Sequence, residues 1–191
     1  MSELTVRTAV PDDTAALAEL AAETFPLACP PGTTAAAIAA FVAEHLTAAR
    51  FAEYVRDEAR MVLVAHESEP HSGLVGYAML IADEPADRDA AAAVTARPTI
   101  ELSKFYTRAA AHGTGVAAPL LTATIDVAAA RGAASLWLGT NERNARALRF
   151  YEKHGFRRVG RKRFKLGDRL EHDWVLERLL VPGEAAAPLI P

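Results

Sequence analysis

Residues 144–156 read NARALRFYEKHGF, and this stretch does most to decide the fold. Within it Ala147, Phe150 and Tyr151 are spaced three and four positions apart, so they share one side of a helix. Gly155 ends that helix, because glycine readily takes the left-handed backbone conformation found after helix C-termini. A short apolar run, Leu-Trp-Leu-Gly, precedes the helix and has the length of a buried strand. The stretch therefore predicts a helix carried between two strands.

A second informative stretch, HGTGVA at residues 112–117, follows an expected strand and opens an expected helix. Gly113 and Gly115 let the backbone approach a ligand, and the N–H groups of a first helical turn point at an anion. The stretch lacks the Gly-Lys-Ser/Thr ending of a P-loop, and its spacing fails the three-glycine dinucleotide fingerprint. Taken alone, the turn predicts a phosphate site or an ordinary glycine-rich connection.

Hydrophobic periodicity and turn residues predict the remaining elements outward from these two stretches. We expect Pro26 to break the first helix, since proline lacks an amide hydrogen and clashes with the preceding turn. Residues 82–98 lack strand periodicity and are interpreted as an insertion or a substrate-side loop, helical in part. We expect one domain over residues 1–181, followed by a flexible Ala/Pro-rich tail over residues 182–191. The expected strands cover 4–8, 61–65, 76–81, 99–106, 136–139, 156–164 and 172–180, and the expected helices cover 14–23, 48–56, 89–94, 113–131 and 144–154, with a further helix capped by Thr33 or Thr34.

Composition narrows the class of protein. The chain has 191 residues, of which 51% are hydrophobic and 24% charged, with a formal net charge of -3. That charge argues against a nucleic-acid partner, because dedicated nucleic-acid binders carry a basic excess. Cys29 is the only cysteine, so no disulfide can form within the chain. We find no apolar run long enough for a bilayer and no signal-peptide pattern, and therefore expect a cytoplasmic protein with no membrane partner.

The two stretches together resemble the GNAT acetyltransferase superfamily. The element Asn-x-x-Ala-x-x-Phe-Tyr-x-x-x-Gly-Phe matches at every fixed position of residues 144–156. The cofactor signature Arg/Gln-x-x-Gly-x-Gly/Ala matches residues 112–117 except at His112. The resemblance implies an α/β (more narrowly α+β) GNAT fold. Its central sheet is mixed, mostly antiparallel and twisted, with about seven strands, flanking helices and a splay between the fourth and fifth strands.

The same resemblance implies acetyl transfer from acetyl-CoA directly to an amine, with no metal. It makes Tyr151 the proton donor to the leaving thiolate, the alternative being a core tyrosine packed beside Phe150. It makes Glu101 either the base or a group that binds the substrate ammonium, the alternative being a solvent-facing charge on an edge strand. Because transfer is direct, Cys29 is interpreted as a structural residue rather than a nucleophile. The implied cofactor-binding residues are Phe105, Tyr106, Thr107, His112, Gly113, Thr114, Gly115, Val116, Ala117, Ala118, Asn144, Ala145, Arg146, Ala147 and Tyr151.

His112 stands where the family usually has Arg or Gln. A histidine can donate to phosphate but carries a full charge only part of the time near neutral pH. Main-chain amides are then expected to make most of the contacts with the cofactor's phosphates, and the cofactor affinity is expected to be weaker. A solvent-exposed loop histidine is the alternative.

The acceptor amine is less well defined. Phe164, Gly167, Asp168 and Asp173 form a C-terminal pattern similar to that of bacterial spermidine/spermine N-acetyltransferases. A polyamine needs an acidic cleft, although acidic groups are more often solvated surface. Another small amine, an amino acid derivative and a protein amine stay open, as do a catalytically silent acyl-CoA sensor and an unrelated α/β protein. The resemblance also implies a homodimer. Candidate cleft residues are Glu23, Asp83, Glu84, Asp87, Asp89, Glu101, Asp168, Glu171 and Asp173.

Overall fold

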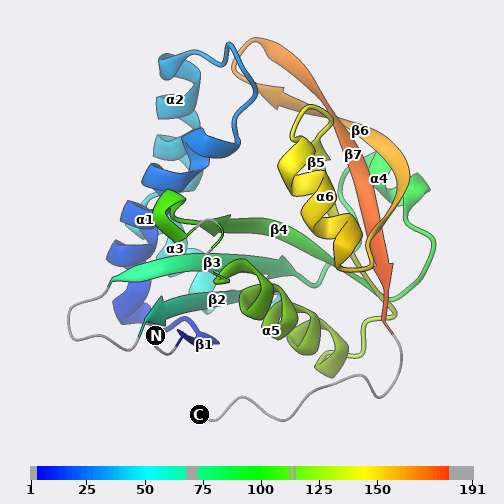
Figure 1. Ribbon diagram of the computed structural model, residues 1–191, viewed down its shortest axis with the longest axis horizontal. Coiled ribbons are helices and arrows are strands. Elements are labelled where there is room, and N and C mark those ends of the chain that lie inside the picture. Colours follow the sequence, from blue (N-terminus) through cyan, green and yellow to red (C-terminus); the bar gives the residue numbers. More distant parts are fainter. Residues whose placement is uncertain (1–3, 68–72, 112, 114, 181–191) are drawn as a thin grey trace.

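Seven strands form one sheet in the order β1-β2-β3-β4-β5-β7-β6. A computed structural model describes residues 4–67, 73–111, 113 and 115–180 (Figure 1). All neighbouring strands are antiparallel except β4 and β5, which run parallel. The predicted mixed, mostly antiparallel sheet is confirmed. The strands are β1 (Leu4–Thr8), β2 (Arg60–Glu67), β3 (Leu74–Ile81), β4 (Thr99–Thr107), β5 (Ser135–Asn141), β6 (Arg157–Leu166) and β7 (Arg169–Leu179).

The sheet opens between β4 and β5. Their parallel pairing covers three residue pairs and ends at Glu101 and Trp137. Beyond that point β4 continues to Thr107 and β5 continues to Asn141 with no pairing between them in the described register. The expected splay is therefore present. It leaves the peptide groups on one edge of β4 available to an added strand or an extended ligand.

Helices cover both faces of the sheet (Figure 1). On one face α1 and α3 bury Leu17, Leu20 and Phe51 against β2 and β3. On the opposite face α5 and α6 bury Leu120 and Leu148 in a second apolar cluster. The helices are α1 (Thr14–Ala28), α2 (Ala35–His45), α3 (Ala48–Arg56), α4 (Arg88–Ala93), α5 (Ala117–Ala130) and α6 (Ala145–Lys153), with short 3-10 turns η1 (Pro11–Asp13) and η2 (Ala109–Ala111).

Two predicted helix boundaries are wrong. Helix α1 continues through Pro26 to Ala28, because the missing amide hydrogen affects only its last turn, where Phe25 is anchored in the core. Helix α5 begins at Ala117 rather than at Gly113. Gly113 and Gly115 have φ of 81° and 96°, and such left-handed residues cannot belong to a right-handed helix.

The segment 82–98 packs against strands β6 and β7. Helix α4 packs directly on β6, where Gly160 leaves room for Ala93. The buried carboxylate of Glu177 accepts hydrogen bonds from the backbone N–H groups of Thr95 and Ala96 and from the Thr95 hydroxyl. None of the residues of this segment lines the cavities described below, so the structure gives the interpretation as a substrate-side loop no support.

The expected flexible tail and the positions His112 and Thr114 lie outside the described residues. Among the described helices, none is alone long and apolar enough to cross a membrane. Helices α2 and α3 together meet that criterion by length and composition, with a bend of 43° between them.

Candidate active site

Two cavities meet where the sheet splays open. The first, of about 450 Å³, lies among the end of β4, the start of α5 and α6, and we call it the cofactor cavity. The second, of about 380 Å³, lies among α1, α2, β4, β5 and the β6–β7 hairpin, and we call it the acceptor cavity. Ala28, Tyr106 and Asn144 line both. A group held at this junction is therefore reachable from either side.

The end of β4 forms one wall of the cofactor cavity. Phe105, Tyr106 and Thr107 all line it, and their backbones pair with β3 on one side only. The free edge faces the splay, because β5 has already diverged. An extended arm that carries amide groups can therefore add to β4 as a strand would.

The glycine turn and the start of α5 form the second wall. Gly113, Gly115, Ala117 and Ala118 line the cavity. A Cβ atom added at either glycine would meet nothing within 4 Å, so the turn leaves open space in front of its backbone. The N-cap residue Val116 offers no side-chain hydrogen bond to the first turn of α5. The first-turn N–H groups can therefore bind an anion.

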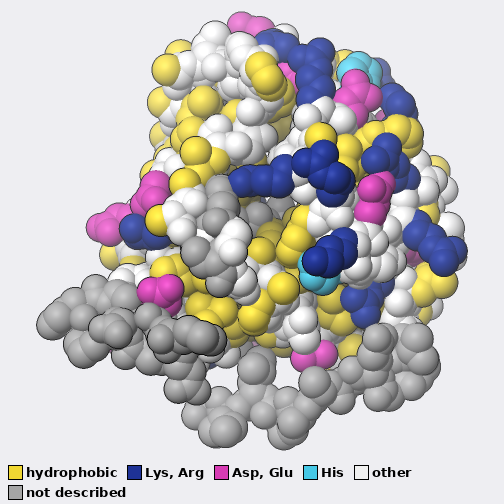
Figure 2. Space-filling view, viewed as in Figure 1, with side chains coloured by type: hydrophobic (Ala, Val, Ile, Leu, Met, Phe, Trp, Pro, Cys, Tyr) yellow, Lys and Arg dark blue, Asp and Glu magenta, His cyan; other side chains and the backbone are white. Residues whose placement is uncertain are grey.

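Helix α6 supplies the third wall. Asn144 caps it, with Oδ1 accepting a hydrogen bond from the Ala147 backbone N–H at 3.1 Å. The side-chain amide nitrogen of Asn144 is thereby left as the donor toward a ligand. Arg146 and Ala147 also line the cavity. Figure 2 shows lysine and arginine side chains gathered over α6, a favourable setting for a polyanionic ligand.

Tyr151 lies on the inner side of α6, in the cofactor cavity. Its ring packs against Phe105, Phe150 and Phe156, with centroid distances of 6.1, 5.4 and 5.5 Å. Burial raises the pKa of its phenol above the ordinary value, so the hydroxyl keeps its proton near neutral pH. The side chain is thus both a core residue and part of the cavity wall, and its hydroxyl is protonated near neutral pH.

Tyr106 stands at the junction of the two cavities. Its ring stacks on Tyr77 at 5.6 Å and meets Phe25 edge-on at 6.4 Å. Burial raises the pKa of its phenol as well. The sequence pointed to the backbone of this residue, whereas the structure adds a role for its side chain as a wall between the cavities.

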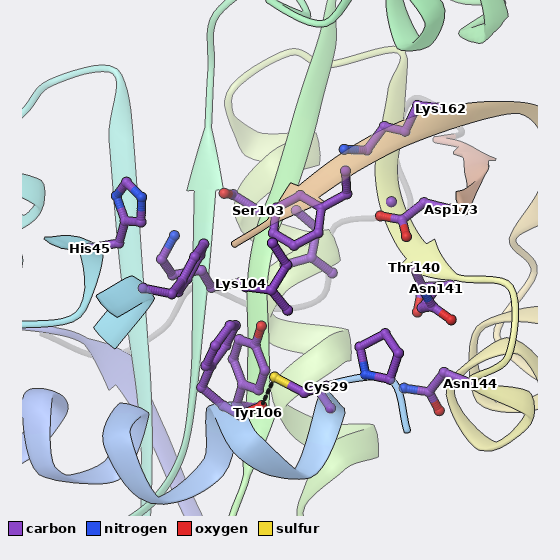
Figure 3. A pocket seen from close by; sticks show the side chains of 18 of the residues that line it. Cys29, His45, Ser103, Lys104, Tyr106, Thr140, Asn141, Asn144, Lys162 and Asp173 are labelled. Carbon is purple, nitrogen blue, oxygen red and sulfur yellow. Dashed lines mark hydrogen bonds between the residues drawn. The ribbon is translucent and has the colours of Figure 1, made fainter. Parts of the chain in front are cut away.

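Four charged side chains line the acceptor cavity: Glu101, Lys104, Lys162 and Asp173. Figure 3 shows Lys162 and Asp173 on the β6–β7 side, with Lys104 toward His45 on the opposite side. Lys162 and Asp173 are register partners on β6 and β7. Glu101 is half-buried in the cavity wall rather than a solvent-facing charge at a sheet edge.

A β-bulge explains why Lys104 belongs to this group. Leu102 pairs with Leu80 and Lys104 pairs with Met79, which leaves Ser103 without a partner in β3. The extra residue reverses the alternation of side chains along β4. Lys104 therefore lies on the face of the sheet that also carries Glu101.

Burial shifts the ionisation of these groups. It raises the pKa of Asp173 to about 6, with Lys162 acting in the opposite direction. Burial also raises the pKa of Glu101, again opposed chiefly by Lys162. It lowers the pKa of Lys104 to about 8. A carboxylate with a pKa near 6 is well matched to accept a proton near neutral pH.

Aromatic side chains close the acceptor cavity. Phe41 of α2 stacks on Phe25 at 4.3 Å and meets Phe164 of β6 at 6.0 Å. At the hairpin turn a Cβ atom added at Gly167 would lie 3.0 Å from Cβ of Ala37. Helix α2 and the hairpin are therefore in direct contact above the cavity.

The structure separates the expected site residues into groups. Ala145 is exposed at the start of α6, and the side chain of Val116 is buried in the core, so neither lines a cavity. Cys29 lines the acceptor cavity, but burial raises the pKa of its thiol, which keeps the weakly nucleophilic protonated form. His112 and Thr114 lie outside the described residues. The remaining expected cofactor-binding residues, Phe105, Tyr106, Thr107, Gly113, Gly115, Ala117, Ala118, Asn144, Arg146, Ala147 and Tyr151, line the cofactor cavity.

The acidic residues also divide. Glu101 and Asp173 line the acceptor cavity, whereas Glu23 pairs with Arg108 at 3.3 Å outside it. Lys104 and Lys162 were not singled out from the sequence. Lys162 could have been found from its position in the strand that pairs with the strand of Asp173. Lys104 reaches the cavity only through a β-bulge, which no residue pattern predicts. Within the described part of the chain, no three His, Cys, Asp or Glu side chains are grouped to share a metal ion.

Comparisons with known proteins agree with this geometry. The acetyltransferase (GNAT) family matches residues 15–156. An uncharacterized N-acetyltransferase of Mycobacterium tuberculosis is 47% identical over 166 residues, which cover 86% of this chain and 96% of that protein. The PaiA N-acetyltransferase of Thermoplasma acidophilum, solved with coenzyme A, has a TM-score of 0.71 at 17% identity, covering 93% and 99% of the two chains. A spermidine N-acetyltransferase chimera from Vibrio cholerae and hSSAT has a TM-score of 0.64 at 18% identity, covering 93% and 96%.

The open sheet with its parallel β4–β5 pair and paired cavities defines an acyltransferase of the GNAT type. The chain belongs to the acetyltransferase (GNAT) family. It is an acetyl-CoA-dependent N-acetyltransferase.

Proposed function

We propose that the chain transfers the acetyl group of acetyl-CoA directly to a primary amine of a small molecule held in the acceptor cavity. The observation that carries this proposal is the meeting of two cavities at Tyr106 and Asn144. One cavity has the free strand edge and uncapped helix start that suit pantetheine and pyrophosphate. The other has carboxylates that suit an ammonium group.

The cofactor roles follow from the walls of the cofactor cavity. The pantetheine arm adds to the free edge of β4 at residues 105–107, and the Asn144 amide donates to it. The pyrophosphate binds the N–H groups of the turn and of the first turn of α5. His112 and Thr114 rest on the sequence alone, and His112 is expected to make this site weaker than an arginine would.

Asp173 and Glu101 have different roles toward the substrate amine. We assign proton removal to Asp173, because burial raises its pKa to about 6 and its charge helps to raise the pKa of the Tyr106 phenol at the junction. We assign binding of the substrate ammonium to Glu101, which forms the last residue pair of β4 and β5, with Trp137, at the point where the splay begins. The proton can pass from the amine to Asp173 directly or through one water molecule.

The proposed acetyl transfer needs one protein group that donates a proton, Tyr151. The ammonium gives a proton to Asp173, which passes it to solvent, and the neutral amine attacks the thioester carbonyl. The new C–N bond forms as the C–S bond breaks, and Tyr151 protonates the departing thiolate. The second proton lost from nitrogen restores the Tyr151 hydroxyl.

The acceptor is a small molecule rather than a protein chain on this proposal. Helix α2 contacts the β6–β7 hairpin beside the acceptor cavity, whose volume of about 380 Å³ is that of a small-ligand site. A polyamine is supported by the C-terminal pattern, by the likeness to a spermidine N-acetyltransferase chimera and by the two carboxylates. The two lysines in the same wall weigh against it. The homodimer and the cytoplasmic location implied by the resemblance stay predictions.

Release of the CoA thiol tests the proposal. Purified protein with acetyl-CoA is expected to release thiol only when a suitable amine is present, across a panel of diamines, polyamines, amino acids, aminoglycosides and short peptides. Mass spectrometry is expected to find one N-acetylated product for each thiol released. Calorimetric binding of acetyl-CoA with no amine-dependent thiol release from any acceptor would instead favour a catalytically silent acyl-CoA sensor.

A further inference from the structure

The acceptor cavity holds charged side chains that form no ion pair within the described chain. Glu101, Lys104, Lys162 and Asp173 all line it. None of the four takes part in an ion pair with another residue of the described chain. Charges withdrawn from water and left unpaired are unfavourable, so their presence in one cavity points to a ligand that completes them.

The four charges separate into two groups. Lys162 is the main attractive charge for both Glu101 and Asp173. Two carboxylates against one ammonium leave this group with a net negative charge, which suits the amine of the acceptor. Lys104 lies apart from Lys162 and Asp173, on the opposite side of the cavity toward His45. Glu101 attracts it as well, and its ammonium lies 5.5 Å from the Tyr54 ring centroid.

A backbone irregularity, not regular strand alternation, places Lys104 in the cavity. The bulge at Ser103 brings it into the cavity wall, where it is half-buried and loses hydration. That loss lowers its pKa to about 8, so most of the population is still protonated at neutral pH. The aromatic ring of Tyr54 stabilises a cation only modestly, and an anion supplied by a ligand would stabilise it further.

We propose that the acceptor is a zwitterion, an amine that also bears a carboxylate, with its ammonium at Glu101 and Asp173 and its carboxylate at Lys104. This inference rests on the proposed acetyl transfer and specifies the substrate class of the same cavity. The cavity of about 380 Å³ lies in the range of small-ligand sites, and an amino acid or a short ω-amino acid fits that range. A diamine or polyamine would place a second ammonium against Lys104, where like charges repel.

A matched pair of acceptors tests the sign of the distal group. 4-Aminobutyrate and 1,4-diaminobutane share an aliphatic primary amine and differ in whether the far end is a carboxylate or an ammonium. We expect at least one ω-amino acid in a series from glycine to 6-aminohexanoate to exceed its diamine counterpart in kcat/KM by about tenfold or more. The α-amino acids lysine and ornithine, compared with their decarboxylated diamines, extend the same comparison to branched zwitterions.

Substitution of the cation identifies its source. Lys104→Met keeps the length of the side chain, and it is expected to raise KM for the preferred zwitterion by about tenfold while leaving diamine turnover equal or higher. Lys165→Met removes an exposed lysine of β6 that lines neither cavity and is the matched control. A purely structural role for Lys104 would lower the turnover of both acceptor classes alike, and that result would overturn the assignment.

The acceptor comparison in the unmodified protein decides the matter even if Lys104→Met does not fold. Equal or better turnover of the diamines overturns the zwitterion proposal and leaves the acetyltransferase proposal intact. Absence of thiol release with every amine, despite acetyl-CoA binding, overturns the proposed transfer and with it the inference that rests on it.

Discussion

The pH dependence of turnover follows from the buried carboxylate Asp173. Its pKa of about 6 means that about ten elevenths of the molecules carry the ionised base at pH 7, and about one eleventh at pH 5. If the acceptor binds as its ammonium form and Asp173 must be ionised to take a proton, kcat/KM falls about tenfold between these two pH values. The fall begins near pH 6 and approaches a slope of one per pH unit below it.

Three substitutions should affect this pH profile in different ways. Asp173→Asn removes the base, so we expect kcat/KM at pH 7 to fall by about 10² to 10⁴ and the acidic limb near pH 6 to disappear. Lys162→Met removes the cation that favours the ionised form of Asp173, so the acidic limb should move to higher pH. Glu101→Gln should raise KM for the amine and leave the acidic limb close to its original position.

The assay is thiol release followed with a disulfide reagent that reacts at acidic pH, such as 4,4′-dithiodipyridine, at constant ionic strength and with the amine well below its KM. Circular dichroism at each pH separates catalysis from unfolding. An unchanged acidic limb and near-normal rate in Asp173→Asn would refute the assignment of the base. Loss of the limb in Glu101→Gln alone would transfer that role to Glu101.

Three further changes have defined outcomes. Tyr151→Phe should lower kcat by about 10² or more with an unchanged acetyl-CoA Kd, and equal turnover would remove Tyr151 from the mechanism. Gly115→Val should weaken acetyl-CoA binding about tenfold in calorimetry, because φ of 96° strains the turn that presents its amides. Gly132→Val, with φ of 78° beyond α5, is the control that should lose stability but keep the Kd; parallel losses would locate the pyrophosphate elsewhere. Glu177→Gln should lower the free energy of unfolding by about 2 kcal/mol at pH 7, since buried amides lose an ionised acceptor. Burial opposes ionisation of Glu177, but the hydrogen bonds that it accepts, first of all from the Thr95 hydroxyl, outweigh burial and lower its pKa. The difference in unfolding free energy between the two proteins, measured by urea denaturation, should therefore narrow as pH falls below about 4.

Local signals were sufficient for much of the fold. Asn144 and Gly155 mark the two ends of α6 through side-chain capping and left-handed backbone, both of which depend on neighbouring residues only. Thr34 caps α2 in the same way, with its hydroxyl accepting from the Ala37 N–H at 3.1 Å. Pro26 shows the limit of such signals, because core packing of α1 outweighs one missing hydrogen bond.

The residues that the sequence predicts for cofactor binding fall in three short stretches, residues 105–107, 112–118 and 144–151, and most of them line one cavity. The acceptor side could not be predicted in this way, because it combines β4 with β6 and β7 across the splay. Lys104 reaches the cavity only through the bulge at Ser103, and Lys162 faces Glu101 only after the sheet has formed. The charge of the cavity therefore depends on register, which a single sequence does not reveal.

The most direct measurement of the central claim is a crystal structure with a bisubstrate compound in which an amine acceptor is joined to the sulfur of CoA through an acetyl linker. The account predicts that the compound spans both cavities, with the linker between Tyr106 and Asn144, the pyrophosphate at the start of α5 and the former amine beside Glu101 and Asp173. A CoA moiety bound away from α5, or an acceptor moiety outside the cavity lined by Glu101 and Asp173, would contradict it.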